Sequence, residues 1–320
     1  MATNVKLLRH QGLILQSPYV HTETKFHFDI AGYGAGKTSG LVYALMYTVD
    51  KLQGKKDAEG NFARVMLASK NLTFLSKTSI SNLEQVLRRT NTEYRYDKKN
   101  NIITVGTVDI FLIPLENPET IYGYSVVASF LDELSELPPD VCMEAIKAVN
   151  ERTRQTVKEF RDPFIVSVSS SQGLDGQYMA MEHFRRNGIS YIYIRGETRD
   201  NIYLKKSDIE NLYKIYNDTE RKVYLEGYFL SVKTSLVFSD YDPVKNKLAV
   251  DLFDQLEPDD TVYIGQDFNN FGCAGVACVV KKGAIIVLKD YDIPDIRRAP
   301  EIFRYDFPTQ KIVWIPDATA

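Results

Sequence analysis

Residues 31–38, with the letters AGYGAGKT, have the residue types and spacing of a phosphate-binding loop. Glycines without a side chain let successive backbone N–H groups turn toward one anion, and a following helix directs its positive end at it. In this P-loop pattern Lys37 reaches the β- and γ-phosphates, and the Thr38 hydroxyl binds Mg²⁺. Ala31 replaces the first glycine of the strict pattern, which leaves the phosphate-contacting middle and end intact. The predicted nucleotide-binding residues are Gly32, Tyr33, Gly34, Ala35, Gly36, Lys37, Thr38 and Ser39, with Lys37 also counted as catalytic.

A strand and a helix are expected on either side of this loop. Residues 26–30 are typical of a buried strand, and residues 39–52 of a helix with one apolar face. Strand, loop and helix in this order are the context that supports a nucleotide site. The alternative is a glycine-rich turn that binds nothing.

An Asp–Glu pair follows a second hydrophobic segment, residues 126–131. Downstream of a P-loop this is the Walker B arrangement. Asp132 is expected to hold Mg²⁺ through its water shell, and Glu133 to act as the general base for the attacking water. Because a nucleotide kinase needs no carboxylate to activate water, the pair favours hydrolysis.

Two further polar signals are less specific. Residues 169–173 (SSSQG) follow the predicted strand at residues 164–168, at a position that senses the γ-phosphate in P-loop motors. A serine-rich turn without a sensing role is the alternative. Gln11, upstream of the P-loop, has an amide that could pair with the adenine edge, or it is a surface glutamine.

Two acids in the last part of the chain suggest a second site. Asp267 lies within a predicted strand, and Asp317 ends a later one. Carboxylates that converge from adjacent strands can hold the two metal ions of a phosphodiesterase. The pattern alone favours the alternative, two acids that face solvent.

Alternating strands and helices predict an α/β fold with a mainly parallel sheet covered on both faces. Further strands are expected at residues 64–68, and a hairpin that turns at Gly106. Helices are expected at residues 76–89 and 141–160, and residues 203–228 are expected to form a helical hairpin or linker. The character changes after residue 258, so a second domain is expected, with its boundary between residues 241 and 258. Its strands are predicted at residues 261–267, 273–281, 284–290 and 311–315.

Composition sets limits on the class of protein. The chain has 320 residues, 44% of them hydrophobic and 25% charged, with a net charge of −3. It has no apolar run long enough for a membrane span and no signal-peptide pattern, which favours the cytoplasm. The absence of a strong basic excess counts against a protein that mainly holds nucleic acid. The cysteines fit no disulfide or zinc pattern and are expected in the core, and no histidine is assigned a ligand role.

Taken together and in this order, the motifs resemble the large subunit of tailed-bacteriophage terminase, the ATP-driven motor that packages DNA. Residues 9–11, the P-loop, the Asp–Glu pair, residues 169–173 and residues 226–229 carry the resemblance. It implies a P-loop (RecA-like) ATPase domain at residues 1–245, with a lid near 200–245, and a partial RNase H-like nuclease domain at 258–320. Ser170 is then the coupling residue, and Asp267 and Asp317 are the first two nuclease metal ligands.

The resemblance also implies cofactors and partners. These are ATP and Mg²⁺ for the motor, Mg²⁺ or Mn²⁺ for the nuclease, double-stranded DNA, a portal protein and a small terminase subunit. A homo-oligomeric ring is expected on assembly, in the host cell cytoplasm, and a monomer in isolation is left open. Because the third acid of the nuclease is missing from this chain, little or no nuclease activity is expected.

One departure concerns the arginine finger of such motors. Many family members have a basic residue in the P-loop where this chain has Tyr33. Arg152 and Arg154 are the candidates to replace it, acting on the same or a neighbouring subunit, or they are surface arginines. Two other functions stay open: a helicase or recombination ATPase, and a nucleotide-ordered assembly module without turnover.

Overall fold

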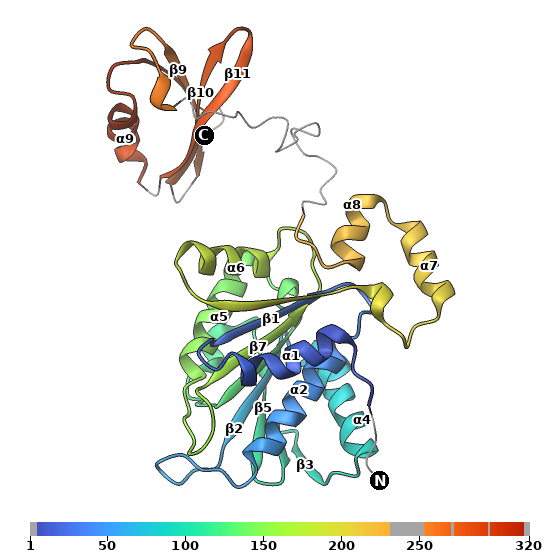
Figure 1. Cartoon of the computed structure of the whole chain (residues 1–320). Coiled ribbons are helices and arrows are strands. Elements are labelled where there is room, and N and C mark those ends of the chain that lie inside the picture. The colour runs from blue at the N-terminus through green and yellow to red at the C-terminus, as the bar shows by residue number, and fades with distance from the viewer. Residues whose placement is uncertain (1–4, 231–252, 270–271, 294, 317–320) are drawn as a thin grey trace. The chain divides into compact units, whose positions relative to one another are not determined.

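The computed structural model describes residues 5–230, 253–269, 272–293 and 295–316 (Figure 1). The chain divides into two compact units, Met1–Leu236 and Val237–Ala320. Most of the expected boundary region, residues 241–258, lies outside the described residues. Each unit is built around one sheet, of eight strands in the larger and four in the smaller.

The larger unit has a mainly parallel sheet with the strand order β3-β4-β5-β2-β6-β7-β1-β8. From β5 to β8 all neighbours are parallel, and β3, β4 and β5 form an antiparallel edge. β1 and β7 are buried along their whole length, as expected for central strands covered on both faces. The strands are β1 (Phe26–Ala31), β2 (Arg64–Ser69), β3 (Tyr94–Asp97), β4 (Ile102–Val105), β5 (Val108–Pro114), β6 (Ala128–Asp132), β7 (Phe164–Ser169) and β8 (Tyr191–Gly196).

Helices cover both faces of this sheet (Figure 1). One hydrophobic core joins the sheet to α1, α2 and α4, and a second joins its other face to α5 and α6. The α-helices are α1 (Arg9–Val20), α2 (Lys37–Leu52), α3 (Leu72–Leu75), α4 (Ser81–Arg89), α5 (Pro139–Arg152), α6 (Gly176–Arg186), α7 (Lys206–Ile215) and α8 (Asp218–Glu220). The 3₁₀ and π turns are η1 (Ser76–Ile80), η2 (Pro118–Ile121), η3 (Leu134–Glu136), η4 (Thr198–Asp200) and η5 (Arg221–Leu225). The predicted α/β fold class is therefore confirmed.

Two predicted helices differ from the structure. The expected helix at residues 141–160 ends at Arg152, where Thr153 pairs with Val126 and carries the chain along the sheet instead. The expected helix at residues 76–89 begins with a π-helical turn, η1, preceded by the short α3. Helix α1 and strands β3 and β8 were not predicted.

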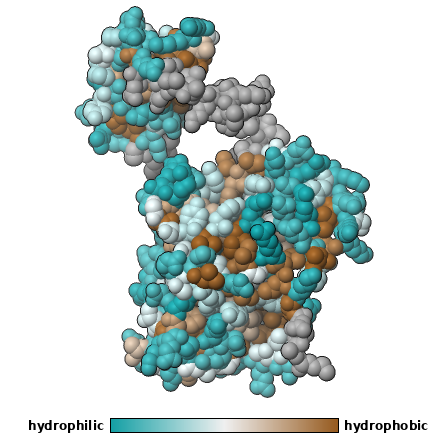
Figure 2. Space-filling model, viewed as in Figure 1, coloured by the Kyte–Doolittle hydropathy of each residue, from teal (hydrophilic) through white to brown (hydrophobic). Residues whose placement is uncertain are grey.

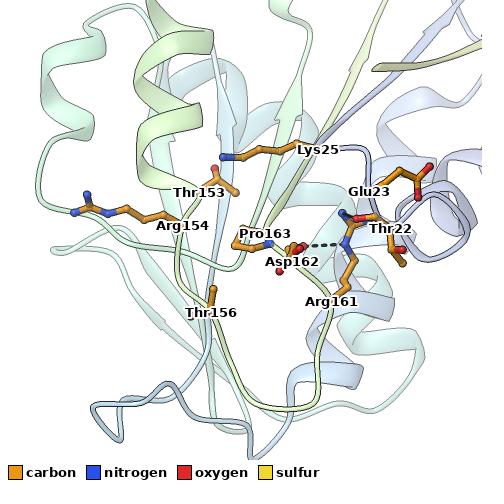
Figure 3. Close-up of a pocket in the computed structure, with 9 residues that line it drawn as sticks. All are labelled: Thr22, Glu23, Lys25, Thr153, Arg154, Thr156, Arg161, Asp162 and Pro163. Carbon is orange, nitrogen blue, oxygen red and sulfur yellow. Dashed lines mark hydrogen bonds between the residues drawn. The ribbon is translucent and has the colours of Figure 1, made fainter. Parts of the chain in front are cut away.

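The amino ends of the central strands form one edge of the sheet, shown in Figure 3. Lys25 directly precedes β1, Pro163 directly precedes β7, and Arg154 follows the end of α5 there. The P-loop follows β1 and the Asp–Glu pair lies at the end of β6, so both lie at the opposite, carboxyl edge. Ligands of open parallel sheets bind at that carboxyl edge.

Helix α1 is amphipathic only in part. Its Leu13 and Val20 side chains are exposed, and Figure 2 shows hydrophobic residues in the middle of the larger unit, where Figure 1 draws α1.

None of the described helices is long and apolar enough to cross a membrane.

The smaller unit has a four-stranded sheet in the order β11-β10-β9-β12, in which only β12 and β9 are parallel. Helix α9 packs on one face, where Cys273, Ala277 and Phe303 are buried. Of the cysteines expected in the core, Cys142 and Cys273 are buried and Cys278 is partly exposed. The elements are η6 (Phe253–Gln255), β9 (Thr261–Asn269), β10 (Gly272–Lys281), β11 (Ala284–Ile293), η7 (Ile296–Arg298), α9 (Ala299–Asp306) and β12 (Lys311–Pro316).

Candidate functional site

The P-loop connects the buried strand β1 to helix α2, as predicted. Gly34 and Gly36 have φ of 73° and 86°, a backbone region that glycine adopts without steric cost. Gly36 is the residue before the first turn of α2, so the N–H groups at the start of this helix face the loop. A cavity of about 310 Å³ opens over the loop. Its lining is Tyr33, Gly34, Gly36, Lys37, Thr38, Ser39, Phe74, Glu133, Glu136 and Ser170.

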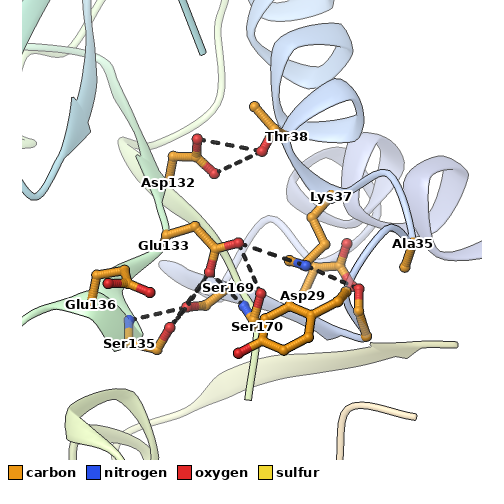
Figure 4. Close-up of polar contacts among 12 residues, drawn as sticks. Asp29, Ala35, Lys37, Thr38, Asp132, Glu133, Ser135, Glu136, Ser169 and Ser170 are labelled. Atoms are coloured by element: carbon orange, nitrogen blue, oxygen red, sulfur yellow. Dashed lines mark hydrogen bonds and ion pairs between the residues drawn. The ribbon is translucent and has the colours of Figure 1, made fainter. Parts of the chain in front are cut away.

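Asp132 lies beside the loop, fully buried at the end of β6. The Thr38 hydroxyl lies 3.2 and 3.4 Å from its two carboxylate oxygens (Figure 4), and the Ser79 hydroxyl donates to Oδ2 at 2.5 Å. Burial raises the pKa of Asp132 to about 6, although the hydrogen bond from Ser79 opposes this. A carboxylate next to the hydroxyl of Thr38, which lines the cavity, fits Mg²⁺, which binds through one or two carboxylates together with substrate phosphates.

Glu133 follows Asp132 in the chain and lines the cavity. Its carboxylate accepts hydrogen bonds from the Ser170 N–H at 2.7 Å and the Ser170 hydroxyl at 2.9 Å, and lies 3.6 Å from the Lys37 ammonium. Figure 4 shows the Glu133 carboxylate joined by dashed lines to both Lys37 and Ser170. Its backbone has φ 54° and ψ 57°, a left-handed conformation that is uncommon for a residue with a side chain. Such strain persists where surrounding contacts hold it, and it is often found at functional sites.

The serines at the end of β7 therefore contact the candidate general base directly. Ser170 is the expected coupling residue, and its neighbour Ser169 donates to the Glu133 carboxylate at 3.3 Å. Ser169 also accepts from the Ser135 N–H, which fixes the turn after Glu133. Three groups therefore donate to the Glu133 carboxylate: the Ser170 N–H, the Ser170 hydroxyl and the Ser169 hydroxyl. A change in the position of Glu133 would alter these hydrogen bonds at the end of β7.

Gln11 is buried rather than on the surface. Its amide N–H donates to the Gly36 carbonyl at 2.7 Å, and its amide oxygen accepts from the Leu8 N–H at 2.9 Å. The side chain thus joins the start of α1 to the P-loop. The expected contact with adenine stays a prediction.

His10 is a support of the P-loop that sequence reasoning did not find. Its Nδ1 lies 2.7 Å from the Asp29 carboxylate and its Nε2 lies 3.0 Å from the Ala35 carbonyl oxygen. Because both neighbours are acceptors, the ring satisfies both when it carries two protons. Burial lowers the pKa of His10, but the hydrogen bond and charge of Asp29 outweigh it, and the pKa is raised overall.

Three other residues near the loop also lacked a sequence signal. Ser79 lies in the π-helical turn η1, a kind of irregularity that is frequent at functional sites. Thr198 and Asn201 contact the P-loop from the segment after β8, and neither belongs to a recognisable motif. Their role depends on contacts between distant parts of the chain.

Neither of the arginines expected as a finger lines the cavity over the P-loop of its own chain, and their expected role stays a prediction. The backbone oxygen of Arg152 accepts from the Val126 N–H, six residues before Asp132, so Arg152 lies about 20 Å away along the strand direction. Its guanidinium contacts the Glu151 carboxylate and the Tyr122 ring. Arg154 lines a separate cavity of about 330 Å³ at the amino edge (Figure 3). A role on a neighbouring subunit stays a proposal.

The candidate nuclease acids are only partly described. Asp267 is exposed on β9, and β9 is the parallel neighbour of β12, with Gln266 opposite Pro316. Asp317 lies outside the described residues. No group of three or more His, Cys, Asp or Glu side chains that could hold a metal ion occurs in the described part of the chain.

Comparisons with known proteins give structural similarity only. No family model matches the chain, and no curated protein matches its sequence. The large terminase of a thermophilic bacteriophage in complex with ADP is similar, with a TM-score of 0.58 and 14% identity over 98% of this chain and 78% of that chain. The same protein with ATP-γ-S gives a TM-score of 0.56 over the same shares, at 14% identity. The large terminase of bacteriophage HK97 gives 0.51, with 11% identity over 99% of this chain and 71% of that chain. The fold of this chain is therefore that of the phage large terminases.

Proposed function

We propose that this chain is an Mg²⁺-dependent ATPase, the motor subunit of a viral DNA-packaging machine. The observation that carries the proposal is the position of Glu133. Its carboxylate is held by Ser170 at 2.7 and 2.9 Å, opposite Lys37, over the cavity of a P-loop. A second carboxylate, Asp132, lies next to the Thr38 hydroxyl. Similar structures that bind ADP and ATP-γ-S support a nucleotide in this cavity.

Phosphate binding requires a change of partner at Lys37. In the structure its ammonium lies between the Gly32 carbonyl, at 3.1 Å, and the Glu133 carboxylate. A triphosphate brings several negative charges to this place, so Lys37 turns to the phosphates and leaves Glu133 with Ser170. Thr38 and Asp132 would hold Mg²⁺, which supplies charge neutralisation for the phosphates.

Hydrolysis then depends on Glu133 as the base. Its carboxylate keeps the two hydrogen bonds from Ser170, which orient it over the cavity, and it can accept a proton from a water molecule in line with the terminal phosphate. When hydrolysis changes the charge near Glu133, the hydrogen bonds to Ser170 change with it. Ser170 follows β7, so this contact can pass the nucleotide state to the rest of the unit.

The test compares the parent chain with Glu133→Gln, with and without double-stranded DNA. We expect ATP hydrolysis by the parent, and in Glu133→Gln a loss of turnover with ATP-γ-S binding retained, because the amide keeps the shape but is not a base. Retained turnover in Glu133→Gln would refute the assignment of the base. Nucleotide binding without turnover in the parent, even on assembly, would favour a nucleotide-ordered module.

The remaining parts of the proposal concern partners and the smaller unit. We propose double-stranded DNA, a portal protein and a small terminase subunit as partners, a ring as the working assembly, and the host cytoplasm as its location. Asp267 and Asp317 are proposed as metal-binding acids of a nuclease site that uses Mg²⁺ or Mn²⁺. DNA cleavage by this chain that is lost in Asp267→Asn would support this assignment.

A further inference from the structure

The segment after β8, residues 198–225, contacts the P-loop through side chains and backbone. The Thr198 hydroxyl donates to the Tyr33 carbonyl oxygen at 2.7 Å, and the Asn201 amide donates to the Gly34 carbonyl oxygen at 2.6 Å. Thr198 is fully buried and Asn201 is 8% exposed. These two side chains are therefore buried polar groups whose partners are consecutive carbonyls of the loop.

A 3₁₀ turn explains why two such contacts come from neighbouring residues. Thr198 begins η4 and Asn201 follows its last residue, with the Asn201 N–H bonded to the Thr198 carbonyl. Side chains three residues apart are eclipsed in a 3₁₀ turn, so both point to the same side. The turn therefore places the two donors close enough together to bond to two consecutive carbonyls of the loop.

The next two carbonyls of the loop are held from helix α1. His10 contacts the Ala35 carbonyl at 3.0 Å, and Gln11 donates to the Gly36 carbonyl at 2.7 Å. The carbonyls of residues 33–36 are therefore each bound by a different side chain. Two of these side chains come from α1 and two from the segment after β8.

Because each peptide bond is planar, these contacts also fix the orientation of the N–H groups of the loop. In a planar trans peptide the C=O of one residue and the N–H of the next point in opposite directions. Fixing the carbonyls of residues 33, 35 and 36 outward therefore turns the N–H groups of Gly34, Gly36 and Lys37 to the inner side of the loop. Within the described part of the chain, no backbone acceptor binds the Gly34 or Gly36 N–H. The Ala35 N–H instead closes the loop onto Gly32 at 3.1 Å.

The P-loop is also in close contact with residues 224 and 225 of this segment. The Tyr33 N–H donates to the Tyr224 carbonyl at 2.7 Å, and the two tyrosine rings are stacked at 5.5 Å. A Cβ on Gly32 would lie 2.1 Å from the Leu225 carbonyl oxygen and 2.4 Å from the Thr198 hydroxyl. The loop and the segment after β8 therefore fit together only with glycine at position 32.

We propose that Thr198 and Asn201 are positioning residues that set the affinity of the P-loop for phosphates. Thr198 holds the Tyr33 carbonyl and so turns the Gly34 N–H inward, and Asn201 holds the Gly34 carbonyl and so keeps the Ala35 N–H in the bond that closes the loop onto Gly32. The inference rests on the proposed function, in which this loop binds ATP. It adds that nucleotide affinity depends on a segment more than 160 residues away in sequence. Displacement of that segment would therefore lower the affinity of the P-loop for phosphates.

The experiment removes each donor without a large change of shape. Thr198→Val and Asn201→Leu are compared with Thr198→Ser, which keeps the hydroxyl. Thr153→Val is the matched control, because Thr153 is equally buried and its hydroxyl bonds at 2.7 Å to Ser129 and to the Val149 carbonyl, at the other edge of the sheet. Dissociation constants for ADP and ATP-γ-S are measured by calorimetry with Mg²⁺, together with KM and kcat for ATP and the midpoint of thermal unfolding.

We expect Thr198→Val and Asn201→Leu each to weaken ADP and ATP-γ-S binding by about fivefold to tenfold, the effect of one hydrogen bond. KM should rise while kcat at saturating ATP stays within about twofold. Thr198→Ser should bind like the parent, and Thr153→Val should lower the unfolding midpoint without a change in affinity. Parent-like affinity in both Thr198→Val and Asn201→Leu would overturn this inference alone. A parent that binds no nucleotide would overturn the proposed function as well.

Discussion

Ser79→Ala should raise the concentration of Mg²⁺ that nucleotide binding requires. The Ser79 hydroxyl donates to the Asp132 carboxylate at 2.5 Å, and both side chains are fully buried. After the substitution the carboxylate keeps only the longer contacts with Thr38, at 3.2 and 3.4 Å. The Oδ2 atom of Asp132 then lacks its nearest hydrogen-bond donor, although the side chain is not exposed to solvent.

The size of the effect follows from the energy of that bond. A hydrogen bond to a charged group contributes about 1.5–3 kcal/mol, which corresponds to roughly one to two pH units in the pKa of its acceptor. Burial already raises the pKa of Asp132 to about 6, and Ser79 opposes that rise. Without Ser79 the pKa of Asp132 should therefore rise further. Because Mg²⁺ binds the ionised carboxylate, its affinity should fall by about twofold to tenfold at neutral pH.

The assay titrates ADP binding with free Mg²⁺ at about pH 7 and again at about pH 8.5. We expect Ser79→Ala to need more Mg²⁺ than the parent at the lower pH, and the difference to shrink at the higher pH, where Asp132 is ionised in both. Thr78→Ala is the control, because the Thr78 hydroxyl belongs to the same π-helical turn but bonds to the Phe74 carbonyl. An equal Mg²⁺ requirement in Ser79→Ala and Thr78→Ala at both pH values would refute the reasoning.

Three further substitutions test other contacts. Gly32→Ala should abolish nucleotide binding, because its Cβ would lie 2.1 Å from a carbonyl oxygen, whereas Gly12→Ala has open space and should bind like the parent; calorimetry distinguishes them. Ser170→Ala removes the 2.9 Å bond to the Glu133 carboxylate but keeps the N–H bond, so kcat should fall by about tenfold with ATP-γ-S affinity retained; unchanged kcat would speak against coupling. His10 has a raised pKa, so its contribution to stability is complete below pH 6.5 and is lost as pH rises through the folded-state value. Urea unfolding across this range should show that loss in the parent and not in His10→Gln.

The parts of the site that could be predicted are those whose chemistry lies in a continuous stretch of chain. The P-loop and the Asp132–Glu133 pair each follow a hydrophobic strand directly, so spacing alone indicates them. Ser79 could not be found in this way, because its side chain reaches Asp132 only through the π-helical turn. Residues 153–160 show a different limit. Their pattern continues that of α5, but the pairing of Thr153 with Val126 prevails over helix propensity.

The order of the strands accounts for the arrangement of the whole site. In the sequence of neighbours β2-β6-β7-β1-β8, the P-loop follows β1 and Glu133 follows β6, with β7 between them. Adjacent strands are about 4.8 Å apart, so the starts of these two turns are separated by about 10 Å, room enough for a phosphate and a water molecule. Ser170, which follows the strand in the middle, must then lie between Glu133 and the loop. By the same order Thr198 follows β8, the other neighbour of β1. The proposed coupling residue, Ser170, and the proposed positioning residue, Thr198, therefore follow the strands on opposite sides of β1.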